Sequence, residues 1–125
     1  MTRFFLSIAA ILAVLSVAAG AFAAHGLKDS LSERALEIFD TAARYQMYHA
    51  LALMFVALLL SGSEAAQSIL TVAGLAFITG TVLFSGSLYG LSVTGMKGLG
   101  AITPLGGVAF IIGWVCIAIA AWNFD

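Results

Sequence analysis

The chain has 125 residues, of which 62% are hydrophobic and 9% are charged, and its mean hydropathy is +1.11. Soluble domains carry about 25% charged and about 45–50% apolar residues, so this composition excludes a water-soluble globular protein and indicates an integral membrane protein. The net charge of −1 gives no sign of a nucleic-acid partner. Because a spanning helix needs about 20 residues, the length predicts a single membrane domain, residues 1–125, with four spans.

The first apolar run, residues 4–24, is predicted to be the first span. Arg3, the apolar stretch and the Ala21-Phe22-Ala23 triplet together imitate a cleaved secretory signal. The run is longer than the roughly 7–15 residues of a signal core. We therefore expect a retained span, with cleavage as the alternative.

The next segment holds most of the charged residues. Ser30 and Glu33 fit a capping box, in which the two side chains bond free N–H groups at a helix start. Apolar residues then recur at steps of three and four, which indicates an amphipathic helix. Asp40 and Arg44 have the i,i+4 spacing of a helical ion pair. We predict an amphipathic helix at residues 31–44 that lies at the membrane surface and runs into the second span.

Three further apolar runs predict the remaining spans at residues 45–61, 66–93 and 105–122. A glycine-rich loop at residues 94–104 ends in a Thr-Pro pair, which suits the first turn of the last helix. The predicted fold class is all-α: an integral membrane four-helix bundle with an amphipathic interfacial helix between the first and second spans.

The orientation follows from the distribution of Lys and Arg. Segments 25–46 and 94–104 contain four of these residues, Lys28, Arg34, Arg44 and Lys97. The opposite side of the membrane has only Arg3. The positive-inside rule then predicts that both segments are cytoplasmic and that both termini lie outside.

Four ordered motifs carry a resemblance to a known family. They are Gly20-Ala21-Phe22-Ala23-Ala24-His25-Gly26-Leu27-Lys28, Thr41-Ala42-Ala43-Arg44-Tyr45-Gln46-Met47-Tyr48-His49-Ala50-Leu51, Leu83-Phe84-Ser85-Gly86-Ser87-Leu88-Tyr89, and Ile102-Thr103-Pro104-Leu105-Gly106-Gly107 with Gly113-Trp114. The chain resembles the bacterial domain-of-unknown-function 423 family (UPF0382), which is related to the eukaryotic transmembrane protein 256 group. In the family pattern Ala23 is more often glycine. The resemblance implies a small multi-pass protein of the bacterial inner membrane with a retained first helix, and it implies no reaction.

The best candidate for a functional site is a polar cluster at the start of the second span: Asp40, Arg44, Tyr45, Tyr48 and His49. Polar groups in or near spans are often functional because they are costly in hydrocarbon. Histidine titrates near neutral pH and arginine binds phosphate with two parallel hydrogen bonds, so the cluster suggests a proton relay or an anionic-headgroup site. The alternative is structural, with interfacial anchors at the membrane boundary and a histidine that bonds a neighbouring helix.

His25, which follows the first span, is the sixth candidate. A metal site shared with His49 would need further ligands that the sequence does not indicate, and the single cysteine, Cys116, lies inside the last apolar run. We therefore predict no metal and no cofactor, and a hydrogen-bonding role for His25.

Small residues in the first and third spans are predicted to allow close helix packing. They are Ser16, Gly20 and Ala24, and Ser85, Gly86, Ser87 and Gly90. A polar path for a small solute or proton along the third span is the alternative.

These observations favour a non-catalytic accessory, assembly or scaffolding protein whose partners are the lipid bilayer and either itself or a larger membrane complex. A small transporter or proton-conducting element built on Arg44, Tyr45 and His49 is the second hypothesis. An enzyme is disfavoured because the sequence shows no paired carboxylates in the spans and no nucleophile–base or metal-ligand arrangement.

Overall fold

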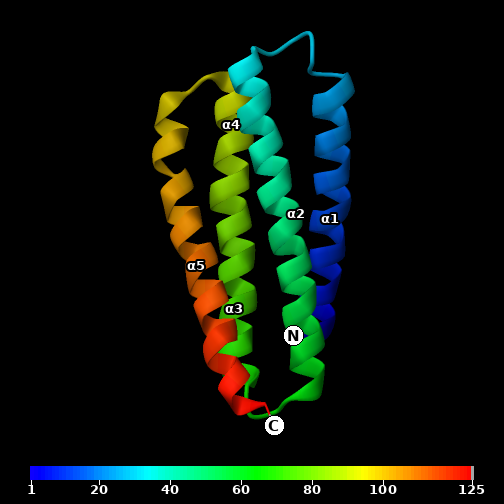
Figure 1. Ribbon diagram of the computed structural model, residues 1–125, viewed down its shortest axis with the longest axis vertical. Helices are drawn as coiled ribbons and strands as arrows, with labels where there is room; N and C mark the ends of the chain where they lie inside the picture. Colours follow the sequence, from blue (N-terminus) through cyan, green and yellow to red (C-terminus); the bar gives the residue numbers. More distant parts are fainter. Residues whose placement is uncertain (125) are drawn as a thin grey trace.

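A computed structural model describes residues 1–124 of the chain. The described residues form four helical rods and no strand: α1 (Thr2–His25), α2 (Glu33–Gly62), a third rod of α3 (Gln67–Gly80), η1 (Thr81–Ser85) and α4 (Gly86–Thr94), and a fourth of η2 (Lys97–Ala101), α5 (Thr103–Ala120) and η3 (Ala121–Asn123). The rods run alternately up and down, so the two chain ends lie at the same end of the bundle (Figure 1). All four are long and apolar enough to cross a membrane. The predicted all-α four-helix fold class is confirmed.

The segment 31–44 does not form a helix of its own. From Glu33 onwards it belongs to α2, a continuous helix of 30 residues that runs along the bundle (Figure 1). At about 1.5 Å per residue α2 is about 45 Å long, whereas the hydrocarbon core of a bilayer is about 30 Å thick. The charged first turns can therefore extend beyond the hydrocarbon, and their placement at the membrane surface stays a prediction.

Local sequence explains where two of the helices begin or end. Ser32 caps α2, because its Oγ accepts a hydrogen bond from the backbone N–H of Ala35 at 3.1 Å. The predicted capping box of Ser30 and Glu33 is therefore wrong: the serine next to the helix, not the one before it, has its hydroxyl within reach of the free N–H groups. At the end of α4, Gly95 adopts the left-handed conformation with φ 71, which favours glycine.

The third rod contains a π-helical segment, η1, at Thr81–Ser85. Its hydrogen bonds close wider turns than those of an α-helix, and such segments are frequent at functional sites. The predicted loop at 94–104 is also partly helical, since η2 is a 3₁₀-helix at Lys97–Ala101. Pro104 occupies the first turn of α5 as predicted.

Neighbours in the bundle follow the order of the chain. α1 packs mainly on α2, and α5 packs mainly on α3 and η1, so α1 and α5 lie at opposite edges (Figure 1). The largest fully buried apolar side chains, Phe5, Leu53, Val56, Leu70 and Phe77, belong to one core cluster. All five lie in the half of the bundle that carries the chain ends. The interior of the other half includes buried polar side chains, such as Ser16, Gln46 and Ser85.

Glycines set the close approach of the third and fourth rods. A Cβ added at Gly113 would lie 2.5 Å from the Phe77 ring, and one at Gly80 would lie 2.3 Å from the Phe110 ring. At Gly106 the obstacle is backbone, because an added Cβ would lie 2.3 Å from the amide nitrogen of Phe84. Small residues allow this kind of helix contact in membranes, so these positions fix the α3–α5 interface.

Candidate functional site

α2 carries two distinct sets of polar side chains between residues 40 and 49. Gln46 and His49 point into the bundle and are buried, whereas Arg44 and Tyr48 are exposed. Successive helical residues are rotated by about 100°, so positions one or two apart in sequence can face the bundle interior and its outside. The predicted polar cluster is therefore divided between two environments.

Gln46 joins three helices. Its Nε2 donates a hydrogen bond to the carbonyl oxygen of Leu12 in α1 at 2.8 Å. Its Oε1 accepts a hydrogen bond from the hydroxyl of Tyr89 in α4, also at 2.8 Å. Because both ends of the amide are bonded to different neighbours, this one side chain holds α1 and α4 in register against α2.

His49 joins α2 to α5. Its Nδ1 lies 2.7 Å from the carbonyl oxygen of Tyr45 and its Nε2 accepts a hydrogen bond from Trp114 Nε1 at 3.2 Å. These two contacts select the tautomer in which Nδ1 carries the proton. The imidazole also stacks on the ring of Phe110, with centroids 3.5 Å apart and an interplanar angle of 4°. Both nitrogens of the ring are thus engaged, Nδ1 within α2 and Nε2 across to α5.

Two hydroxyls bond adjacent carbonyls of α2. Ser16 in α1 donates to the carbonyl oxygen of Ala43 at 2.6 Å, and Ser85 at the end of η1 donates to that of Ala42 at 2.8 Å. Both serines are buried. With the contacts of Gln46 and His49 they form a hydrogen-bonded layer across all four rods, which we call the polar layer: Ser16, Ser85, Gln46, Tyr89, His49 and Trp114. Within residues 1–124, no buried side-chain nitrogen or oxygen lacks a hydrogen-bond partner.

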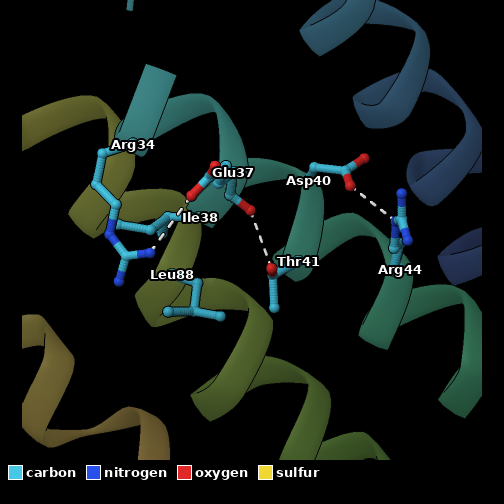
Figure 2. Close-up of a pocket in the computed structure, with 7 residues that line it drawn as sticks. All are labelled: Arg34, Glu37, Ile38, Asp40, Thr41, Arg44 and Leu88. Carbon is cyan, nitrogen blue, oxygen red and sulfur yellow. Dashed lines mark hydrogen bonds and ion pairs between the residues drawn. The ribbon is translucent and has the colours of Figure 1, made fainter. Parts of the chain in front are cut away.

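The outward set lies on the opposite side of α2. Asp40 and Arg44 form the predicted i,i+4 ion pair, with Arg44 Nε 2.7 Å from Asp40 Oδ2 (Figure 2). Tyr48 is exposed one turn further along the same face. Tyr45 is intermediate between the two sets, because its ring stacks on Phe84 with centroids 4.7 Å apart while remaining partly open to the outside.

His25 lies apart from these residues. It is the last residue of α1 and is exposed. His49 is buried near the middle of α2. The described part of the chain holds no group of three or more His, Cys, Asp or Glu side chains placed to bind a metal ion. His25 and His49 therefore do not share a site in this structure.

The residues predicted for helix packing have different surroundings. Ser87 Oγ lies 2.6 Å from Thr103 Oγ1, and a Cβ added at Gly90 would lie 2.8 Å from a methyl of Leu99. Added Cβ atoms at Gly20 and Gly86 would meet nothing within 4 Å, and Ala24 is exposed. Gly86 therefore faces outward, whereas Gly90, one turn further along, packs against the fourth rod.

Several contributors to the site were not singled out from the sequence. Gln46 and Trp114 complete the polar layer, and Gly80, Gly106 and Gly113 form close contacts between the third and fourth rods. A signal for Gln46 was available, because an amide within an apolar run requires a partner in the membrane. Nothing in the spacing identifies Trp114 as the partner of His49, since the two are 65 residues apart.

Fold and site together define a small multi-pass membrane protein whose four rods are joined by the hydrogen bonds of the polar layer. The family described as "Protein of unknown function (DUF423)" matches residues 19–107, and the chain belongs to this family, as the sequence motifs predicted. It is 50% identical to the UPF0382 membrane protein YwdK of Bacillus subtilis (strain 168), over 98% of each chain. It is 45% identical to a UPF0382 membrane protein of Staphylococcus epidermidis and 43% identical to the UPF0382 membrane protein SAB0533 of Staphylococcus aureus, again over 98% of each chain. No solved structure is significantly similar.

Proposed function

We propose that this membrane protein is a non-catalytic accessory, assembly or scaffolding component that presents its outer helix faces to a partner or to lipid. The observation that carries the proposal is the state of His49. Both of its ring nitrogens are engaged, one with the Tyr45 carbonyl and one with Trp114. A group that relays protons or acts as an acid or base needs a nitrogen free to reach a substrate, whereas a helix-joining histidine needs none.

The rest of the polar layer supports the same conclusion. Gln46, Tyr89, Ser16 and Ser85 each bond a neighbouring helix. Hydrogen bonds of this kind stabilise membrane helix association by about 0.6 kcal/mol on average. A layer of such bonds makes the bundle rigid, and a rigid bundle with short loops is suited to present fixed surfaces.

The alternative, a transporter or proton-conducting element, finds less support. It requires Arg44, Tyr45 and His49 to line one path. The Arg44 side chain is 66% exposed on the outside of α2, while His49 is 5% exposed inside the bundle.

The decisive experiment is affinity purification of the tagged full-length chain from native membranes in a mild detergent, with the bound proteins identified by mass spectrometry. We expect co-purification of a larger membrane complex or of a second, differently tagged copy. A strictly monomeric chain without any protein partner would contradict the scaffolding role. The transporter alternative is tested in parallel with vesicles, where Arg44→Ala and His49→Ala would both have to abolish proton flux.

We further propose that the protein lies in the bacterial plasma (inner) membrane with segments 25–46 and 94–104 in the cytoplasm. The lysine and arginine distribution supports this orientation, and the up-and-down order of the rods puts both segments at one end of the bundle (Figure 1). A C-terminal fusion to a reporter that is active only in the cytoplasm should stay silent. A bright reporter would reverse the orientation.

A further inference from the structure

Arg44 lies where α2 changes from a charged to an uncharged helix. Residues 45–62 contain no Asp, Glu, Lys or Arg. At about 1.5 Å per residue they extend about 27 Å, close to the roughly 30 Å of a hydrocarbon core. If these residues fill the hydrocarbon, Arg44 lies at its edge, at the depth of the phospholipid headgroups.

An open groove of about 480 Å³ borders Arg44 on the outside of α2 (Figure 2). Two arginines and two acids line it, Arg34 with Glu37 and Arg44 with Asp40. Ile38 of α2 and Leu88 of α4 add apolar surface. The groove thus combines charges of both signs, with no net charge, and an apolar wall.

Arg44 has unused hydrogen-bonding capacity. A guanidinium group carries five N–H donors, and the ion pair with Asp40 engages Nε alone. Neither terminal nitrogen of Arg44 is bonded to an acceptor in residues 1–124. A guanidinium with two free terminal nitrogens is suited to bind a phosphate by two parallel hydrogen bonds.

Below Arg44, the same side of α2 becomes an apolar track. Tyr48, Leu51 and Phe55 are all more than half exposed and follow one another at the three- and four-residue steps that keep side chains on one helix face. A molecule with a charged head at Arg44 and an apolar tail along this track would match the surface from end to end. A phospholipid has this structure, with a charged headgroup and apolar acyl chains.

We propose that the groove around Arg44 and Asp40 binds the headgroup of a phospholipid that carries both a phosphate and a primary ammonium group, as in phosphatidylethanolamine. The free nitrogens of Arg44 bind the phosphate, and the carboxylate of Asp40 accepts hydrogen bonds from the ammonium. The balanced charge of the groove favours this zwitterion over an anionic headgroup. A quaternary choline headgroup has no N–H to donate to Asp40 and binds less well. The inference rests on the position of α2 in the membrane and is independent of the scaffolding role.

The test uses the full-length protein in detergent, titrated with phosphatidylethanolamine, phosphatidylglycerol or phosphatidylcholine and followed by native mass spectrometry. We expect phosphatidylethanolamine to be retained in preference to the other two. Arg44→Gln should reduce its retention roughly tenfold or more, because a charge-assisted hydrogen-bonded pair is lost. Lys97→Gln is the matched control, since Lys97 is an exposed cation at the same end of the bundle, and it should leave retention unchanged.

Asp40→Asn is the most specific test, because it should change which of the three lipids is preferred. It leaves Arg44 without its carboxylate partner, so the groove gains a net positive charge and the preference should shift from phosphatidylethanolamine to phosphatidylglycerol. Helical content by circular dichroism should be the same for all variants. Equal retention of all three lipids by the wild type, or unchanged retention in Arg44→Gln, would overturn the proposal.

Two other occupants would be recognised in the same experiment. Inorganic phosphate, added alone at millimolar concentration, should neither bind nor compete, and competition would indicate a site for soluble anions. A dimer that is present in the wild type and lost in Arg44→Gln would indicate that a second copy covers this face. Either result would contradict the lipid assignment.

Discussion

Trp114 Nε1 donates a hydrogen bond to His49 Nε2 at 3.2 Å, and through this contact the fourth rod is joined to the second. Phe110, one turn earlier in α5, stacks on the same imidazole. The two residues of α5 hold His49 from its edge and from its face. The contact converts a histidine that could titrate into a structural element of the bundle.

His49 is expected to matter more through packing than through its hydrogen bond. His49→Ala removes the stacked ring and leaves a cavity, which should lower the free energy of unfolding by about 2–4 kcal/mol. Trp114→Phe removes the donor but keeps an aromatic ring at this position, and should cost about 1 kcal/mol. Reversible unfolding in mixed micelles measures both losses. Trp122→Phe is the control, because Trp122 is 91% exposed; equal losses in the two test variants would show that the stacking contributes nothing.

Gln46 and Tyr89 should behave as a coupled pair. Tyr89→Phe breaks the hydrogen bond that the two residues share and should lower the unfolding free energy by about 0.6–1.7 kcal/mol. Gln46→Leu also loses the bond to the Leu12 carbonyl and should cost more. The double variant should lose less than the sum of the two, because the shared bond is lost only once. Tyr48→Phe serves as the matched control, since Tyr48 is exposed on the outer face. Strict additivity in the cycle would argue against the bond.

Two glycine substitutions should change the stability of the bundle in opposite directions. Gly106→Ala places a methyl 2.3 Å from the backbone of Phe84, and overpacking of this kind costs about 1–3 kcal/mol. Gly86→Ala meets no atom within 4 Å and removes a flexible residue from a helix, so it should stabilise by about 0.5–1 kcal/mol. The melting temperatures in detergent test the pair. A gain of stability in Gly106→Ala would mean that η1 and α5 do not approach this closely.

The ion pair of Arg34 and Glu37 should contribute little to stability. Its side chains are 80% and 64% exposed, and their charged atoms are 3.4 Å apart. Exposed pairs of this type stabilise by about 0.3–0.5 kcal/mol, so Glu37→Gln should shift the melting temperature barely and less still at high salt. A large, salt-insensitive loss would show that a partner or lipid buries this end of α2.

The sequence determined the membrane class, the four spans and the family because these depend on composition, run length and contiguous motifs. It also indicated the Asp40–Arg44 pair, since i,i+4 neighbours meet whenever the helix forms. It did not locate the start of α2, because Ser30 and Ser32 are both good caps and local preference does not choose between them. The apolar periodicity of residues 31–44 was equally compatible with a surface helix and with the first turns of a long span.

The division of the polar cluster was decided by the tertiary structure alone. Arg44 and His49 are five residues apart in the sequence, yet one faces outward and the other is stacked against Phe110. Their roles depend on which neighbours the bundle places beside α2: Leu12, Tyr89 and Trp114 come from three other helices. The sequence shows which polar groups need hydrogen-bond partners in the membrane. Only the packing of distant helices determines which partners they find, because a hydrogen bond requires an approach of about 3 Å. The spacing of residues along the chain does not encode that approach.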